Sequence, residues 1–172
     1  MKSGIRKILA CVLALALCFS MMLPAYAAAP EAETKAAALK QLGLFMGVSD
    51  TDFALDRAPT RVEALVMLLR TLGVEDDAKA STATHPFTDV PGWADRYIAY
   101  AYENGLTKGV SDTSFGTGNA DSDMYLTFML RALGYSDTDG DFVWNAPDTL
   151  AKAVGILPDS VNTGSFMRSD VV

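Results

Sequence analysis

The chain has 172 residues, of which 50% are hydrophobic, and a formal net charge of −7 at neutral pH. This length suits about one ordinary domain beside a short leader. The acidic balance argues against a nucleic-acid partner, which needs a basic face, and against adhesion to anionic lipid.

The first 27 residues have the pattern of a secretory signal peptide. Basic residues precede an apolar run that starts at Ile8, and Ala25-Tyr26-Ala27 supplies a small-x-small cleavage site. The run is shorter than the ~20 apolar residues that span a membrane. We therefore predict cleavage after Ala27, secretion, and no membrane contact afterwards. Both cysteines, Cys11 and Cys18, leave with the leader, and the remaining chain has a net charge of −10.

An eleven-residue segment occurs twice in the remaining chain. Residues Gly43–Phe53 return 62 positions later as Gly105–Phe115, with eight of the eleven identical. Each copy follows a helix-like stretch and leads through a polar loop into an apolar segment. The chain is therefore predicted to be an array of helix-loop-helix units.

The first unit is predicted to contain two helices. Residues 31–44 have an Ala-rich composition that Gly43 interrupts, with one apolar face formed by Ala37, Leu39, Leu42 and Phe45. After a loop over residues 47–59, Thr60-Arg61-Val62-Glu63, here called the tetrad, opens a second helix that Gly73 closes. Thr60 and Glu63 also form a capping box. Residues 75–84 are small, polar and acidic, which indicates a flexible link.

The second and third units repeat this plan with losses. The second begins with an opening motif, Phe87–Trp93, before predicted helices over residues 94–104 and 122–133. The third has a short helix over 148–154 and a tetrad-like segment, Phe166–Asp170. It would need roughly another dozen residues to bury a second helix. We therefore divide the chain into a signal peptide (1–27), repeat 1 (28–77), repeat 2 (78–136) and a partial repeat 3 (137–172).

These motifs, in this order, resemble the S-layer homology family. That family has a Phe-x-Asp-Val-x-x-x-Trp opening, a Gly-Leu-x-x-Gly loop and a Thr-Arg-Ala-Glu helix start. Phe87, Asp89, Val90 and Trp93 match the opening with one residue missing, and the tetrad has Val for Ala. The resemblance implies an all-α fold of tandem repeats in a pseudo-threefold arrangement, the third repeat being incomplete here. It covers nearly the whole chain after the leader.

The resemblance also implies a function and a set of ligand-binding residues. Such domains anchor exported proteins to Gram-positive-type walls by binding pyruvylated secondary cell-wall polysaccharide without covalent chemistry. The family's arginine meets the ligand's negative charge, and the tryptophan, aspartate and loop glycines line the groove. Carried over, the expected ligand-binding residues are Arg61, Glu63, Trp93, Asp89, Gly47, Gly109 and, more weakly, Arg168. Other surface-layer proteins are a further expected partner.

Each of these residues also has a purely structural interpretation. A guanidinium beside a helix start suits a carboxylate, but Arg61 could equally pair with an acid such as Asp56. Capping accounts for Glu63 without a ligand. Trp93 is predicted to favour the core, and Gly47 and Gly109 are turn residues first of all.

Departures from the family pattern leave a second interpretation open. The second tetrad reads Asp121-Ser122-Asp123-Met124, which has no arginine and adds two carboxylates, so its groove is predicted not to bind. The alternative function is therefore a degenerate or truncated module with a structural role at the cell surface. In that role it would bind no glycan, or would borrow its missing helix from another chain.

Catalysis and metal binding have little support in the sequence. His85 is the single histidine, and no cysteine follows the leader, so a nucleophile or a metal site lacks its usual residues. Residues Asp137–Asp141 alternate acids as in a calcium loop, but position six is Phe142 instead of glycine. We expect a solvated acidic turn there, no cofactor, and no enzyme activity.

Overall fold

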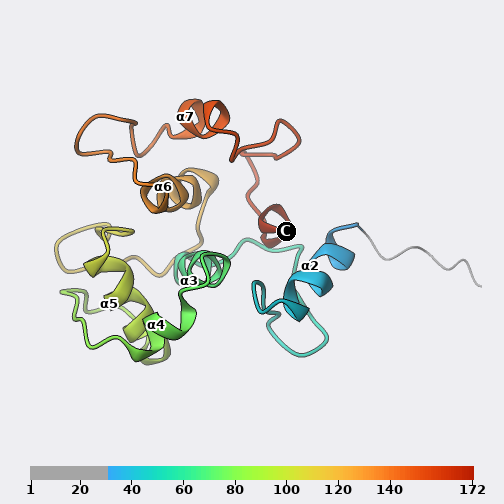
Figure 1. Cartoon of the computed structure of the whole chain (residues 1–172), viewed down its shortest axis with the longest axis horizontal. Coiled ribbons are helices and arrows are strands. Elements are labelled where there is room, and N and C mark those ends of the chain that lie inside the picture. Colours follow the sequence, from blue (N-terminus) through green and yellow to red (C-terminus); the bar gives the residue numbers. More distant parts are fainter. Residues whose placement is uncertain (1–30) are drawn as a thin grey trace, which may run out of the picture. The chain divides into compact units, whose positions relative to one another are not determined.

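The computed structural model of the chain describes residues 31–172, which are almost entirely helices and loops (Figure 1). The predicted signal peptide lies outside these residues. The helices are α2 (Glu31–Gln41), α3 (Arg61–Thr71), α4 (Glu75–Ala80), α5 (Asp95–Glu103), α6 (Ser122–Ala132) and α7 (Asp148–Ala153), with 3-10 helices η1 (Gly92–Ala94) and η2 (Arg168–Val171). This part of the chain has no strand, which confirms the all-α prediction. The pseudo-threefold arrangement stays a prediction.

Helix α3 is the centre of the hydrophobic core, and its start follows the tetrad. The Thr60 hydroxyl accepts a hydrogen bond from the Glu63 N–H, and the Glu63 carboxylate accepts one from the Thr60 N–H. This capping box was predicted, and it satisfies two backbone donors that a helix start leaves free. Gly73, at φ +72°, ends the helix as expected.

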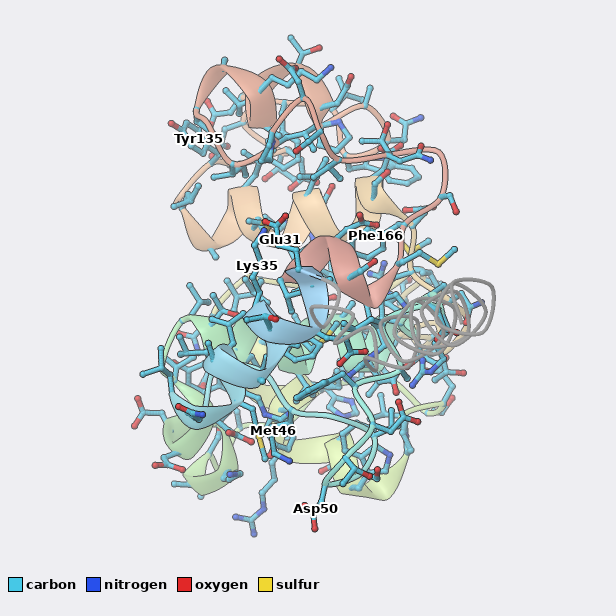
Figure 2. The ribbon with its side chains drawn as sticks, turned by 90° about the vertical axis from the view of Figure 1, so that its right-hand side faces the viewer. Glu31, Lys35, Met46, Asp50, Tyr135 and Phe166 are labelled. Carbon is cyan, nitrogen blue, oxygen red and sulfur yellow. The ribbon has the colours of Figure 1, made fainter. Side chains whose placement is uncertain are left out.

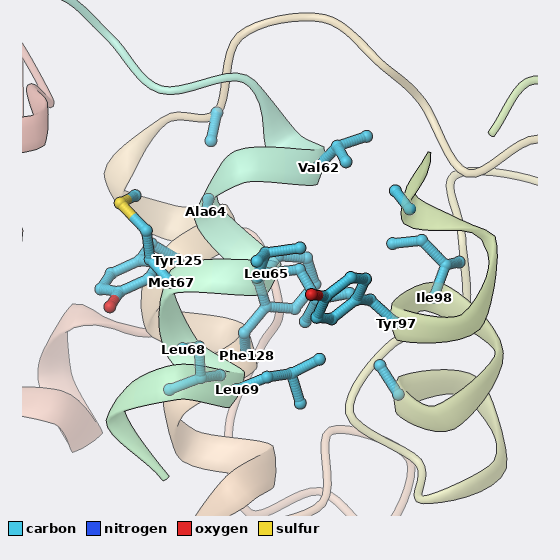
Figure 3. Close-up of a cluster of buried hydrophobic side chains, with 14 of the residues drawn as sticks. Val62, Ala64, Leu65, Met67, Leu68, Leu69, Tyr97, Ile98, Tyr125 and Phe128 are labelled. Carbon is cyan, nitrogen blue, oxygen red and sulfur yellow. The ribbon is translucent and has the colours of Figure 1, made fainter. Parts of the chain in front are cut away.

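The apolar residues of α3 lie between two other helices. Leu65 and Leu69 are fully buried, and Figure 3 shows them among Tyr97 of α5 and Phe128 of α6. Helix α3 contacts α4, α5 and α6, so one helix of the first repeat holds the second repeat on two sides. Burial of each such side chain contributes roughly 1.5–3 kcal/mol.

Two predictions for the first repeat were wrong in detail. Residues 75–84 begin with a helix, α4, instead of a flexible link. Ala78 is fully buried, and the Glu75 carboxylate lies 3.1 Å from Arg70 Nε and accepts a hydrogen bond from the Tyr97 hydroxyl. These tertiary contacts hold a short helix that its composition alone would not stabilise.

The predicted face of α2 is also rotated. Ala36 is buried and Ala37 is exposed, whereas Phe45, just beyond the helix, fills the core. Leu42, the last residue before the turn at Gly43 (φ +73°), is 70% exposed and does not belong to the buried face. Near its start α2 carries the exposed Glu31–Lys35 ion pair, at 2.9 Å (Figure 2).

The three repeats contact one another in a closed cycle. The Arg61 N–H of repeat 1 donates to the Gly118 carbonyl of repeat 2, and the Ser122 hydroxyl of repeat 2 donates to the Thr163 carbonyl of repeat 3. The Arg168 N–H of repeat 3 then donates to the Arg57 carbonyl of repeat 1. The tetrad of repeat 1 and the equivalent segments of the other two repeats therefore each contact the loop of another repeat. The third of these contacts is made by Arg168, at the start of η2.

Candidate functional site

The Arg61 guanidinium is buried without a polar partner in residues 31–172. Arg61 is 7% exposed, and its Nε has no hydrogen-bond partner; no ion pair of this side chain is found in the part of the chain that the structure describes. The guanidinium carbon lies 4.8 Å from the Phe128 ring centroid and 5.1 Å from that of Phe115. It therefore rests on two aromatic rings, and the expected pairing with Asp56 does not occur.

Burial and a neighbouring cation act on the charge of Arg61. Desolvation, followed by the field of Arg131, lowers the pKa of Arg61 from its usual value to about 10. The side chain is still protonated at neutral pH. A buried cation without a partner is costly to the fold, and such groups mark functional sites.

Arg61 lines a cavity of about 400 Å³ between repeats. We call it the Arg61 pocket, and define it by Arg61, Lys108, Gly109, Val110, Arg131 and Trp144. Trp144 is 61% exposed and Val110 is 59% exposed. The pocket thus combines a buried cation with an accessible aromatic face.

Two more cations in the Arg61 pocket share one carboxylate. Asp137 accepts hydrogen bonds from Arg131 Nε and Nη2, both at 3.0 Å, and from Lys108 Nζ at 3.0 Å. The bond from Arg131 and the contact with Lys108 lower the pKa of Asp137 to about 2, against the effect of burial. Three cations and one carboxylate leave a net positive charge. Asp137 is therefore a half-buried ion-pair partner, so the prediction of a solvated acidic turn was wrong at this residue.

Asp89 holds the loop of repeat 2 in place beside Arg61. Its carboxylate accepts hydrogen bonds from the Phe115 N–H at 2.7 Å, the Gly116 N–H at 2.9 Å and the Ser114 hydroxyl at 2.7 Å. Desolvation would raise the pKa of Asp89, but these bonds lower it to about 2. Asp89 does not line the pocket; it fixes the backbone on which Arg61 packs.

A second pocket repeats the Arg61 pocket with other side chains. The Arg168 pocket, of about 160 Å³, is defined by Arg168, Met46, Gly47, Val48, Arg70 and Trp93. These six residues correspond, in the order given, to the residues of the Arg61 pocket: Arg61, Lys108, Gly109, Val110, Arg131 and Trp144. Five of the six residue types are the same, and only Met46 differs from its counterpart Lys108. Arg70 pairs with Glu75 as Arg131 pairs with Asp137. The structure thus contains two copies of one site.

Each nitrogen of the Arg168 guanidinium has a hydrogen-bond partner in the protein. Arg168 is 3% exposed, and its Nε and Nη2 donate to the carbonyls of Phe53 and Met46, both at 2.9 Å. Its guanidinium also lies over Phe45 at 5.1 Å and within 3.6 Å of Met67 Sδ. Burial lowers the pKa of Arg168. This arginine therefore ties repeat 3 to repeat 1.

Glu63 also lines the Arg168 pocket, but its carboxylate has partners. Arg57 donates to both carboxylate oxygens, at 2.7 and 2.9 Å, beside the capping bond from Thr60. The Arg57 bond lowers the pKa of Glu63 to about 2 despite burial. The capping interpretation of Glu63 therefore accounts for its position.

The structure distributes the predicted residues over both pockets. Arg61 and Gly109 lie in one; Gly47, Glu63, Trp93 and Arg168 lie in the other; Asp89 lies in neither. The prediction that Trp93 belongs to the core was wrong, because Trp93 is 59% exposed while its neighbour Ala94 is buried in its place.

Sequence reasoning missed four of the six residues that define the Arg61 pocket, Lys108, Val110, Arg131 and Trp144, and also Asp137, which pairs with two of its cations. The sequence did contain a signal for Arg131. The apolar residues of α3 and α6 align at a shift of 61 positions, and this alignment makes Arg131 the counterpart of Arg70. The others come from loops of different repeats.

Ser122 of the second tetrad lines a further cavity, of about 450 Å³, whose lining has neither an arginine nor a tryptophan. Ser122 stands where the other tetrads have arginine, and its hydroxyl donates to the Thr163 carbonyl at 2.8 Å. Asp121 caps α6 by accepting from the Met124 N–H. Desolvation and the fields of Asp121 and Asp148 raise the pKa of Asp123. That setting is unfavourable to an anion, in line with the predicted inactive groove.

Comparison with known proteins confirms the family resemblance. Residues 86–120, which contain the opening motif and the loop of repeat 2, match the S-layer homology domain. The chain therefore carries an S-layer homology domain.

The relatives of this chain include surface proteins. It is 36% identical over 153 residues to a cell surface protein of Thermoanaerobacter kivui, and 30% identical over 147 residues to the middle cell wall protein of Brevibacillus brevis. These matches cover 79% and 76% of this chain, but 20% and 14% of the relatives. An endoglucanase of a Bacillus strain is 33% identical over 94 residues, which is 54% of this chain and 10% of the enzyme. The chain thus spans a fifth or less of the length of these relatives.

Proposed function

We propose that this chain attaches non-covalently to the bacterial cell wall, and that the Arg61 pocket binds a carboxylate of a pyruvylated secondary cell-wall polysaccharide. The observation that carries the proposal is the buried guanidinium of Arg61, whose Nε finds no partner among residues 31–172, in an accessible cavity. An incoming carboxylate would supply its missing partner. Charge-assisted hydrogen bonds of this kind contribute roughly 1.5–3 kcal/mol.

The other groups of the Arg61 pocket fit a sugar acid. The exposed indole of Trp144 offers a face on which a sugar ring can stack. Lys108 and Arg131 give the pocket its positive potential although the whole chain is acidic. A neutral ligand could accept hydrogen bonds from Arg61 but would leave its buried charge without a counter-ion.

The relatives support a non-catalytic attachment role at the cell surface. This chain matches parts of proteins named for the cell surface, for the cell wall and for an endoglucanase. A segment shared by such different proteins is expected to attach them, not to catalyse. No helix within residues 31–172 has the length and apolar character needed to cross a membrane, and we place the protein at the wall or surface layer of a Gram-positive-type bacterium.

Sedimentation with purified wall sacculi tests this function. The chain should sediment with intact sacculi and remain in solution once the non-peptidoglycan polymer has been extracted. Arg61→Gln should lower the affinity roughly 10- to 100-fold, the equivalent of the lost charged contact. Arg96→Gln is the matched control, because Arg96 is exposed and lies outside both pockets.

Two results would contradict the proposal. Binding that survives polymer extraction would show that the wall ligand is not the polysaccharide. Absence of wall binding in the unmodified chain would favour the alternative structural role, in which the module associates with other surface-layer proteins.

A further inference from the structure

Asp137 places a carboxylate in the wall of a pocket that otherwise collects cations. It lines the Arg61 pocket beside three positively charged side chains. Its counterpart in the other copy, Glu75, is not among the residues that line the Arg168 pocket. A negative charge in the wall of a pocket weakens the attraction of that pocket for an anion. Asp137 therefore acts on a bound ligand in a way that Glu75 does not.

The two oxygens of Asp137 are engaged mainly by Arg131. Arg131 donates from Nε to Oδ1 and from Nη2 to Oδ2, both at 3.0 Å, so this pair is bidentate. Lys108 Nζ donates to Oδ1, also at 3.0 Å. The Arg131 side chain is 10% exposed and the Lys108 side chain 45%. Asp137 therefore neutralises the buried Arg131, and it leaves the accessible Lys108 with further N–H groups for a ligand.

A tight turn holds Asp137 in this position. The Ser136 N–H donates to the Asp141 carboxylate at 2.8 Å, and the Asp139 N–H donates to the Ser136 hydroxyl at 3.1 Å. The contacts of Asp137 with its two cations join this turn to α6 and to the loop of repeat 2. The carboxylate is therefore a fixed part of the pocket wall.

Asp137 removes one unit of positive charge from the pocket. The hydrogen bond from Arg131, together with that from Lys108, lowers the pKa of Asp137 to about 2 against the effect of burial, so the carboxylate is ionised at neutral pH. Within residues 31–172, Arg61 is then the one buried cation of this pocket that has no carboxylate beside it. The pocket thus offers several N–H donors but little charge in excess of one.

The field of Asp137 acts in proportion to the charge of the ligand. A sugar carboxylate brings one negative charge, whereas a phosphate monoester brings roughly 1.5 to 2 at neutral pH. The repulsion from Asp137 is therefore up to about twice as large for the phosphate monoester. The more highly charged group also loses more hydration when it enters the pocket.

We infer that Asp137 is a specificity-determining residue, which makes the Arg61 pocket select a singly charged sugar carboxylate over the phosphate of a sugar phosphate. Lys108 has the opposite effect, because it adds a cation that attracts the more highly charged group more strongly. This inference rests on the proposed function of the Arg61 pocket and adds to it the kind of acidic group that the pocket selects.

Two sugars that differ in their acidic group test this selection. Glucuronic acid carries a carboxylate, and glucose 6-phosphate carries a phosphate monoester. Trp93→Phe leaves Trp144 as the remaining tryptophan, in the Arg61 pocket, so its fluorescence reports binding there. Titrations at neutral pH and low salt, where charge effects are largest, give the ratio of the two dissociation constants. In this background the pocket should bind glucuronic acid at least as tightly as glucose 6-phosphate.

Two substitutions should change this ratio in opposite directions. Asp137→Asn removes the charge and nearly keeps the size of the side chain, so it should improve the affinity for glucose 6-phosphate about 3- to 10-fold more than that for glucuronic acid. Lys108→Met should weaken glucose 6-phosphate more than glucuronic acid. Asp139→Asn is the matched control, because Asp139 is an exposed acid of the same turn that does not line the pocket. It should leave the ratio within about twofold.

The outcomes separate this inference from the proposed function. The inference fails, and the Arg61 proposal stands, if Asp137→Asn leaves the ratio unchanged, if both substitutions move it the same way, or if the unsubstituted pocket prefers glucose 6-phosphate. A purely structural Asp137 would weaken both sugars alike. Should circular dichroism show Asp137→Asn unfolded, Lys108→Met decides by the direction of its effect. A Trp144 signal that responds to neither sugar in any variant overturns the proposed function and this inference together.

Discussion

Arg61 and Arg168 occupy the same position in two copies of one pocket, but within residues 31–172 only the Arg168 guanidinium donates hydrogen bonds to surrounding carbonyls. Both arginines are more than nine-tenths buried and both lie over phenylalanine rings. The difference therefore lies in their partners, not in their burial. Arg168 is a structural residue, and Arg61 carries an unmet hydrogen-bonding requirement that a ligand can fill.

This contrast predicts opposite effects on stability. Arg168→Met should destabilise the fold by about 2–4 kcal/mol, because it leaves two buried carbonyls without donors and loosens repeat 3 from repeat 1. Arg61→Met should leave the free energy of unfolding unchanged or raise it, since it removes an unpaired buried charge. Urea unfolding of both variants at neutral pH measures the difference. If Arg61→Met proved as destabilising as Arg168→Met, Arg61 would be structural as well.

Asp89 should stabilise the loop of repeat 2 in a pH-dependent way. Its folded-state pKa of about 2 lies below the ordinary value of 3.8, so its contribution is complete above pH 3.8 and is lost as the pH falls towards 2. Asp89→Asn should therefore lower stability at pH 7 by roughly 1–2 kcal/mol, a figure reduced for solvent screening of this exposed group.

The difference between Asp89→Asn and the unmodified chain should shrink at pH 2.5, which urea midpoints at the two pH values would show. Asp112→Asn, on an exposed residue of the same loop, is the control. An equal loss at both pH values would mean that the charge of Asp89 is not what holds the loop.

Gly109 is predicted to tolerate no side chain. Its φ is +76°, and a Cβ at this position would collide with the Phe87 ring and lie 2.7 Å from the Ser114 carbonyl oxygen. Gly109→Ala should cost about 1–3 kcal/mol and weaken binding in the Arg61 pocket. Gly118→Ala, where a Cβ meets nothing within 4 Å, is the matched control. Thermal unfolding of the two variants compares them, and equal stabilities would show that the loop adapts.

The fold was predictable where local signals agree with the repeat. The capping box at Thr60 and the regular spacing of apolar residues predicted helix α3, and the same spacing predicted helix α6. Helix α4 was missed because tertiary contacts stabilise it: Ala78 is buried, and Glu75 accepts a hydrogen bond from Tyr97, which lies 22 residues further along the chain.

The candidate site was only half predictable for a similar reason. The tetrad identified Arg61, but its burial and lack of a partner depend on Phe115 and Phe128, which belong to the next repeat. Trp93 was misplaced because an aromatic residue beside a helix usually packs inwards. Here the small Ala94 takes the buried position and leaves the indole outside.

Binding in the Arg61 pocket should persist at neutral pH and weaken in strong alkali. The pKa of Arg61 is about 10, so the cation that meets a carboxylate is lost as the pH rises through that value. Wall sedimentation at pH 7, 9 and 10.5 should show the decline, with circular dichroism to confirm that the chain stays folded. The residual binding of Arg61→Gln should lack this step. A step of the same size in both proteins would assign it to another group.

Salt should separate the two kinds of cation in the Arg61 pocket. The Lys108 side chain is 45% exposed, whereas Arg61 is 7% exposed, and salt screens exposed charges far more than buried ones. Trp93→Phe leaves Trp144 as the remaining tryptophan, in the Arg61 pocket. Fluorescence titration of this variant with polysaccharide released from the wall, between roughly 0.05 and 0.5 M NaCl, should therefore show an affinity that falls with salt. Lys108→Met should remove most of that slope with a small loss at high salt, and Arg61→Gln should lower the affinity at every salt concentration. If Arg61→Gln instead abolished the slope and Lys108→Met kept it, Arg61 would act through long-range attraction and not as the direct partner of the carboxylate.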